Sequence, residues 1–104
     1  MTKVTFYRSG ESFLGFEAGG HAGNLPAGEN IVCAAISTAV GLTECQLTDV
    51  LKLAPDVTID EENAAVRVMF ASPKEAAQPA LKALCMYLRS LAGEYPRYLK
   101  ISEE

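Results

Sequence analysis

The residues best suited to chemistry are the only histidine of the chain and its first cysteine. His21 lies twelve residues before Cys33, and a glycine-rich loop separates the two. The attacking form of cysteine is the thiolate, and a nearby imidazole can take up the proton of the thiol. The pair therefore predicts nucleophilic cysteine chemistry, with His21 as general base and then general acid toward Cys33.

The residues after the loop predict a helix that begins near Asn30, because asparagine is a good N-cap residue. Cys33 would then lie in the first turn, where unpaired backbone N–H groups and the macrodipole favour a thiolate. The same N–H groups could bind an oxyanion during acyl transfer. Asn30 could also orient the imidazole, as in a Cys-His-Asn arrangement. The N-cap role alone is the simpler interpretation.

Plainer roles stay open for both residues. Cys33 follows a valine and precedes two alanines, and cysteine without a disulfide is commonly a small core residue. His21, flanked by glycines and alanine, would suit a surface loop that has no task. Cys45 and Cys85 have no histidine nearby and are expected to be structural thiols. One histidine and three cysteines without C-x-x-C or H-x-x-x-H spacing fit no usual ligand pattern, so we expect no metal and no cofactor.

The elements that must position the pair follow the order β-β-α-β-β-α-β. Alternating apolar residues predict hairpins over 4–18 and 57–70, and residues 98–101 predict a closing strand. Apolar residues at steps of three and four predict two main helices. The first runs from Asn30 to before Pro55, with a buried stripe that includes Val32, Ile36, Ala39, Thr43, Leu47 and Val50. The second begins either at a capping box over 72–75 or near Gln78, since Pro79 conflicts with a straight first turn.

Two hairpins with helices between them favour an α+β fold, with a mostly antiparallel sheet packed with two main helices. A length of 104 residues predicts one domain over 1–104. The net charge of −4 argues against nucleic acid as the primary ligand and favours a basic protein partner. We found no long apolar run and no signal-peptide core, so we expect no membrane span and a cytoplasmic location. Three irregularly spaced cysteines do not form a disulfide framework.

The motif residues resemble the signature of the Prp family, the ribosomal-processing cysteine proteases of bacteria. Gly20-His21-Ala22 is followed, after a short loop, by Gly28-x-Asn30-Ile31-Val32-Cys33-Ala34-Ala35-x-Ser37, and the likeness extends over nearly the full chain. The resemblance implies a cysteine protease in which His21 and Cys33 form the catalytic pair. Its substrate would be the N-terminal extension of the large-subunit ribosomal protein numbered twenty-seven.

The resemblance also implies an α+β homodimer with a mobile substrate loop, formed here around Gly19, Gly20, Gly23 and Gly28. The family usually has aspartate where this chain has Asn30. An amide keeps the N-cap role and can accept a hydrogen bond from imidazole, but it lacks the negative charge that stabilises imidazolium.

Two other functions compete with proteolysis. A non-catalytic ribosome-assembly or ribosomal-protein-binding module would bind the same basic partner without cleaving it. A redox-sensing thiol protein would need a second cysteine close to Cys33, and Cys45 lies about 18 Å away along a straight helix. That separation makes the redox function a poor fit.

Overall fold

The structure is a computed structural model that describes residues 1–20 and 27–104, and the side chains of 1–20 and 30–104. Within these residues the strands and helices run in the predicted order, which confirms the β-β-α-β-β-α-β arrangement. The elements are β1 (Thr2–Ser9), β2 (Ser12–Gly19), α1 (Ala27–Cys45), β3 (Asp56–Asp60), β4 (Ala65–Met69), α2 (Gln78–Glu94) and β5 (Leu99–Glu103). A π-helical turn (Gln46–Val50) continues α1, and a 3₁₀ turn (Glu75–Ala77) precedes α2.

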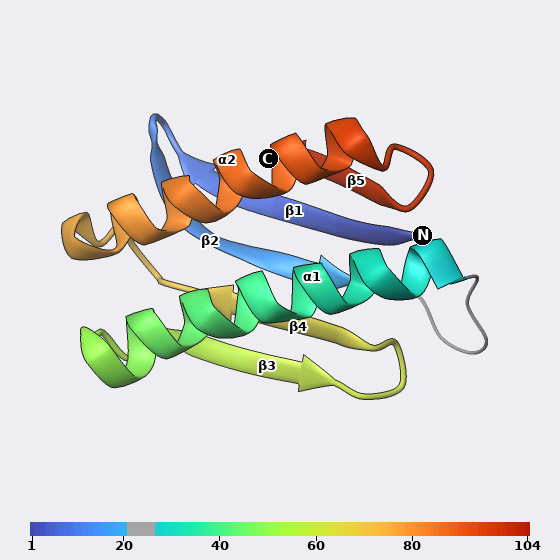
Figure 1. Ribbon diagram of the computed structural model, residues 1–104. Coiled ribbons are helices and arrows are strands. Elements are labelled where there is room, and N and C mark those ends of the chain that lie inside the picture. The colour runs from blue at the N-terminus through green and yellow to red at the C-terminus, as the bar shows by residue number, and fades with distance from the viewer. Residues whose placement is uncertain (21–26) are drawn as a thin grey trace.

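The strands form one five-stranded sheet in the order β3-β4-β2-β1-β5. Only β1 and β5 pair in parallel among the described strands, so the predicted mostly antiparallel sheet is confirmed. Both helices lie on the same face of the sheet, with α1 over its β2–β4 side and α2 over its β1–β5 side (Figure 1). The fold therefore has two layers, and the core lies between them.

The core follows from alternation in the strands and helical spacing in the helices. Val4, Phe6 and Phe16 point from neighbouring strands toward the helices and have no accessible surface. Each helix buries an apolar stripe against this face of the sheet. The stripe of α1 and the turn after it consists of Val32, Ile36, Val40 and Leu47. The stripe of α2 consists of Ala80, Leu81, Leu84, Cys85, Leu88 and Leu91. Burial of such side chains supplies the main driving force for folding, on the order of 2 kcal/mol for each.

The predicted stripe of the first helix fails at its last position. Val50 is 69% exposed, whereas Leu47 is fully buried. The cause is the π-helical turn over Gln46–Val50, because a π turn advances the chain by a smaller angle per residue and shifts the face that later residues present. Gly41 does not break α1, which is continuous through it.

The first helix begins at Ala27 and not at Asn30, so the predicted N-cap at Asn30 is wrong. Gly28 also belongs to α1 and not to the loop in which the sequence analysis placed it. Proline is tolerated at a helix beginning, where its missing N–H costs nothing, so Pro26 in the sequence was the better start signal.

The second helix begins at Gln78, as one of the two predicted starts has it. The side chain of Gln78 ties this start to β2. Its Oε1 accepts a hydrogen bond from the backbone N–H of Phe13 at 2.7 Å, and its Nε2 donates to the carbonyl oxygen of Phe13 at 2.9 Å. The start of α2 is thus fixed on the sheet by a two-bond clamp.

The segment Asn30–Val50 is long and apolar enough to cross a membrane by length and composition, with a mean hydropathy of 1.4. Such a segment was not expected from the sequence. Its apolar stripe is buried against the sheet here, and a core helix passes the same test of length and composition. The hydropathy is therefore weak support for a membrane span.

Candidate active site

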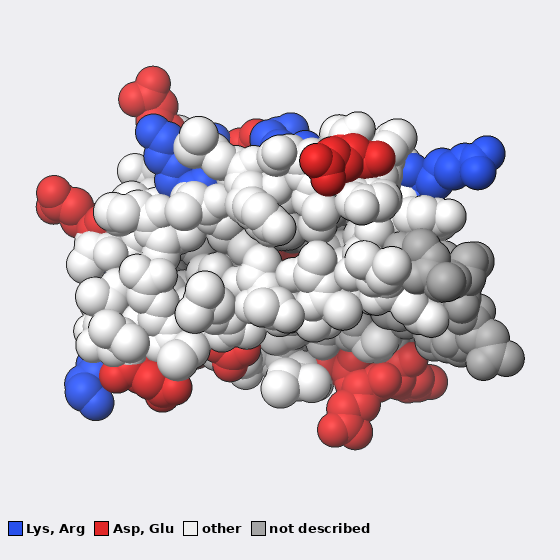
Figure 2. Space-filling model, viewed as in Figure 1, with Lys and Arg blue, Asp and Glu red and all other residues white. Residues whose placement is uncertain are grey.

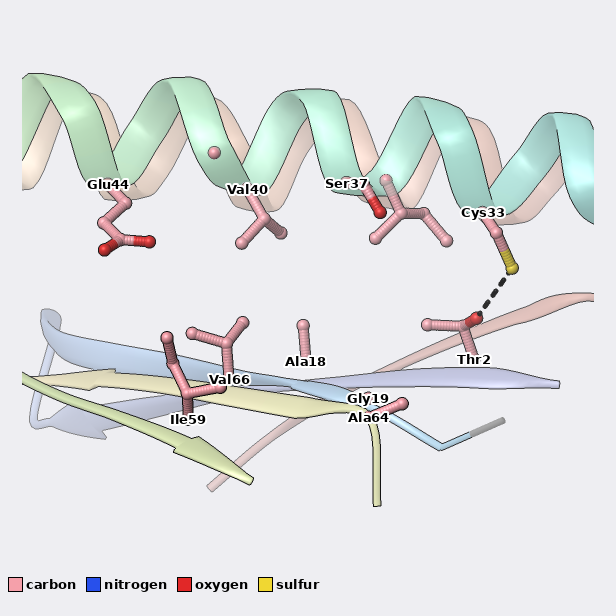
Figure 3. Close-up of a pocket in the computed structure, with 12 residues that line it drawn as sticks. Thr2, Ala18, Gly19, Cys33, Ser37, Val40, Glu44, Ile59, Ala64 and Val66 are labelled. Carbon is pink, nitrogen blue, oxygen red and sulfur yellow. Dashed lines mark hydrogen bonds between the residues drawn. The ribbon is translucent and has the colours of Figure 1, made fainter. Parts of the chain in front are cut away.

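Cys33 lies over the beginning of β1, beside Thr2. The Cys33 Sγ and the Thr2 Oγ1 are 3.6 Å apart, within hydrogen-bonding range for sulfur (Figure 3). Thr2 is only 5% exposed, and its backbone N–H donates to the carbonyl oxygen of Tyr98 at 2.9 Å. The sheet therefore holds this hydroxyl in place, and a hydroxyl in this position can donate a hydrogen bond to a thiolate.

A cleft of about 320 Å³ extends from Cys33 beneath α1. One wall is a stripe of α1 side chains, namely Cys33, Ser37, Val40 and Glu44, which point toward the sheet in Figure 3. The opposite wall comes from β2, β3, β4 and the turn between the last two, and it includes Ala18, Gly19, Ile59, Ala64 and Val66. The half-buried thiol at one end is thus open to a molecule lying in the cleft.

The helix start changes the electrostatic argument for Cys33. The cysteine lies six residues after Ala27, in the second turn of α1 and not in the first. The field of a helix N-terminus falls off within the first turn. The predicted support of a thiolate by first-turn N–H groups is therefore weaker than the sequence suggested. The Thr2 hydroxyl is a further hydrogen-bond partner of the sulfur, and nothing in the sequence pointed to it.

The structure places the glycines of the predicted loop in three different settings. Gly19 ends β2 and lines the cleft, and a Cβ added to it would lie 2.6 Å from the Cβ of Ala65. Gly20 follows with a φ of +114°, a conformation that favours glycine. Gly28 lies in α1, as described above, and Gly23 lies outside the described residues. Gly19 is therefore required for strand packing.

The prediction that His21 pairs with Cys33 lies outside the described residues, because the structure describes no position between 21 and 26. Asn30 is exposed on α1, and its predicted role as an orienting group stays a prediction. Of the other two cysteines, Cys85 is buried and Cys45 is exposed, and neither lines the cleft. Among the described side chains, those of residues 1–20 and 30–104, no group of three or more histidine, cysteine or acidic residues could hold a metal ion.

Three polar residues of the cleft were not predicted as site residues: Thr2, Ser37 and Glu44. A signal for two of them was present. Residues 33, 37, 40 and 44 are spaced by four, three and four, which places them on one face of a helix. Thr2 gave no such signal, because its neighbourhood with Cys33 depends on how the sheet is assembled.

Comparisons with known proteins bear on the family and the fold of the chain. The family model of the cysteine protease Prp matches residues 1–100. Among solved structures, the SMU.848 protein of Streptococcus mutans is 26% identical with a TM-score of 0.87, and the match covers 99% of this chain and 93% of that chain. A comparison with curated proteins found no match.

Two further structures show the same fold. An essential ribosomal processing protease Prp from S. aureus, in complex with a substrate peptide, is 19% identical with a TM-score of 0.83. The same protease with a covalently linked product peptide is 20% identical with a TM-score of 0.82. Both matches cover 100% of each chain. On the family match over residues 1–100, the chain belongs to the cysteine protease Prp family.

Proposed function

We propose that this chain is a cysteine endopeptidase that removes the N-terminal extension of the large-subunit ribosomal protein numbered twenty-seven. The observation that carries the proposal is the half-buried Cys33 at one end of a cleft of about 320 Å³, whose lining on α1 runs from Cys33 to Glu44. The S. aureus relative, described as a ribosomal processing protease, was solved with a substrate peptide, which supports a ribosomal protein as substrate. The net charge of −4 suits a basic partner.

The mechanism that we propose uses His21 and Cys33 as a pair. His21 takes the proton of Cys33, and the Sγ attacks the scissile carbonyl carbon to form a tetrahedral intermediate. His21 then protonates the leaving amine, and water hydrolyses the thioester that remains. One observation supports the pair: Gly19, two residues before His21 in the sequence, lines the same cleft as Cys33. The Thr2 hydroxyl, 3.6 Å from the Sγ, can donate a hydrogen bond to the thiolate. Asn30 is the proposed orienting group for the imidazole.

We also propose that the protein works in the cytoplasm as a homodimer. A second groove, of about 570 Å³, lies between α1 and α2 on the side away from the sheet, and none of its described lining residues carries a charge. Leu42 and Tyr87 in this groove are 69% and 54% exposed. Figure 2 shows that charged side chains lie mainly around the margin of this face. An uncharged surface with exposed apolar side chains suits a second copy of the chain.

The test is cleavage of a peptide that spans the extension and the first residues of the mature ribosomal protein, followed by mass spectrometry. We expect Cys33→Ser to reduce the rate by at least about a thousandfold, because the members of a catalytic unit act together. Cys45→Ser is the matched control, since Cys45 is exposed on the same helix and does not line the cleft. Full cleavage by the Cys33→Ser variant would exclude the mechanism. Binding without cleavage by the unaltered protein would favour the non-catalytic module.

A further inference from the structure

We infer that Glu44 makes the far end of the cleft a binding site for a basic group of the substrate, about five residues from the scissile bond. The inference deepens the proposed function and rests on it. It names a specificity-determining residue and a pattern of substrate side chains: apolar residues next to the bond that is cut, then a lysine, an arginine or a free amino terminus.

The first argument is the length and direction of the cleft. Cys33 and Glu44 are eleven residues apart on α1, and eleven residues bring a helix back to within about 20° of the same face. At 1.5 Å per residue, the two positions are separated by about 16 Å along the helix axis. An extended peptide rises about 3.3 Å per residue, so about five residues bridge this distance. Figure 3 shows both side chains pointing from α1 into the same space above the strands.

The second argument is the chemistry of the walls between the two ends. Val40 from the helix and Val66 and Ile59 from the strands give this stretch an apolar lining. Ile59 lies on β3, an edge strand, and is 67% exposed although its neighbours on the same face are more deeply buried. When a substrate side chain covers an exposed apolar side chain on the cleft wall, the burial of apolar surface favours binding. This part of the cleft therefore suits apolar substrate residues.

The third argument is the charge at the far end. Of the described residues that line the cleft, Glu44 alone is acidic, and no lysine or arginine is among them. Its side chain is half-buried, so water screens the carboxylate less than it would on an open surface. A carboxylate in such a place attracts a cation and disfavours a second carboxylate. A substrate with a basic group at this distance is therefore selected over one with an acidic group.

The experiment compares two series of peptides built on the one cleaved in the first test. Each peptide carries a single lysine or glutamate at positions four to six on one side of the scissile bond or the other, and kcat/KM is measured for each. At one of these positions we expect the unaltered protein to prefer lysine over glutamate by about threefold to tenfold. We expect Glu44→Lys to reverse this preference and Glu44→Gln to remove it.

Glu94→Lys is the matched control, because it makes the same change in net charge at an exposed position at the end of α2, outside the cleft. It should leave the lysine preference as it is. The inference is overturned if Glu44→Lys cleaves the two series with unchanged preference, and cleavage of the parent peptide would then still uphold the proposed function. Fluorescence anisotropy of the same peptides with the Cys33→Ala variant measures the preference as binding alone. That measurement decides the inference even if no peptide is cleaved.

Discussion

Two hollows flank the same helix, and they differ in chemistry more than in size. The cleft beneath α1 holds a thiol, a buried threonine hydroxyl and a carboxylate, whereas the groove between α1 and α2 is lined by uncharged residues and no cysteine. The groove is the larger of the two, at about 570 Å³ against about 320 Å³. Volume alone would therefore point to the wrong place for the chemistry.

The difference is what would let one helix serve the two proposed tasks, substrate binding and dimerisation. Residues at steps of three and four face the cleft, and the residues beside them in the sequence face the groove. Ser37 and Thr38 make the point most simply, since they are adjacent and each lines one of the two hollows. A substitution at Ser37 should therefore affect cleavage of the substrate, and the same substitution at Thr38 should affect the proposed dimer.

Among variants that leave the proposed catalytic pair intact, the largest effect that we expect comes from Ser37→Arg. Ser37 is exposed and points into the cleft between Cys33 and Glu44, so an arginine there occupies the space of a bound peptide. We expect kcat/KM for the peptide to fall by about a hundredfold, because small displacements of a substrate cost rates of this order. The oligomeric state, measured by analytical ultracentrifugation, should not change.

Thr38→Arg is the matched partner of that variant. Thr38 is also exposed, and it lines the groove between the helices. An arginine there brings an uncompensated charge into an uncharged surface, so we expect dimer dissociation to become at least about tenfold easier while the monomer keeps its fold. If Thr38→Arg leaves the dimer intact and lowers cleavage as Ser37→Arg does, the division of tasks between the two faces is wrong.

A smaller effect, on the reactivity of Cys33, is expected from substitution of Thr2. The experiment tests whether the Cys33 thiol is more reactive than an ordinary one. Thr2→Val keeps a β-branched side chain of similar shape and removes the hydroxyl 3.6 Å from the Cys33 Sγ. Loss of a hydrogen bond to a charged group should slow alkylation of Cys33 by iodoacetamide by about tenfold, and Thr2→Ser should restore the rate. Cys45 is the internal reference, because its alkylation should be the same in every variant.

Thr5→Val is the control for that experiment. The Thr5 and Ser102 hydroxyls form a hydrogen bond of 3.0 Å between β1 and β5. Thr5 alternates with the buried Val4 and Phe6, so it lies on the face of the sheet opposite the helices. Like Thr2→Val, the Thr5→Val variant removes a threonine hydroxyl from β1, but this hydroxyl does not line the cleft. An alkylation rate that falls equally in both valine variants would show that Thr2 acts through the stability of the sheet and not on the sulfur.

The sequence predicts well those features that depend on neighbours along the chain. The strand alternation of Val4 and Phe6 and the helical spacing of Val32 and Ile36 are local patterns, and they gave the element order and most of the core. The start of α1 was misjudged, because Asn30 offered an N-cap side chain while the helix extends back to Ala27. Local rules compete at helix ends, and the sequence alone does not show which one wins.

The candidate site was only half predictable for a related reason. Cys33 was found from its own chemistry and from its motif. Thr2 lies thirty-one residues away in the sequence and meets the sulfur only because β1 runs beneath α1. Glu44 shares a helix face with Cys33, but nothing in the sequence shows that this face overlooks a cleft and not the core. Contacts of this kind are set by the assembly of the sheet, which local patterns do not specify.

The smallest effect that we expect is a loss of stability on substitution of Glu103, near the other end of β1. It is the reference against which the effects of the cleft variants are compared. Glu103 on β5 forms ion pairs with Arg8 and Arg89. Hydrogen bonds from Arg8 and then Arg89 lower the pKa of the Glu103 carboxyl below its usual value of 4.5. A lowered pKa in the folded state means that the ion pairs stabilise the fold above about pH 4.5, and that this contribution is lost as the pH falls through the lowered pKa.

Glu103→Gln should therefore lower the thermal midpoint slightly at pH 7 and make no difference at the acid end of the profile, since the pairs are largely exposed and such pairs contribute under about 1 kcal/mol. Glu103 lines neither hollow, so cleavage and dimerisation at 25 °C should stay as they are. This variant therefore measures how a loss of stability alone affects cleavage and dimerisation. If it slowed cleavage as much as Thr2→Val does, the effects assigned to the cleft would have to be reassigned to the stability of the sheet.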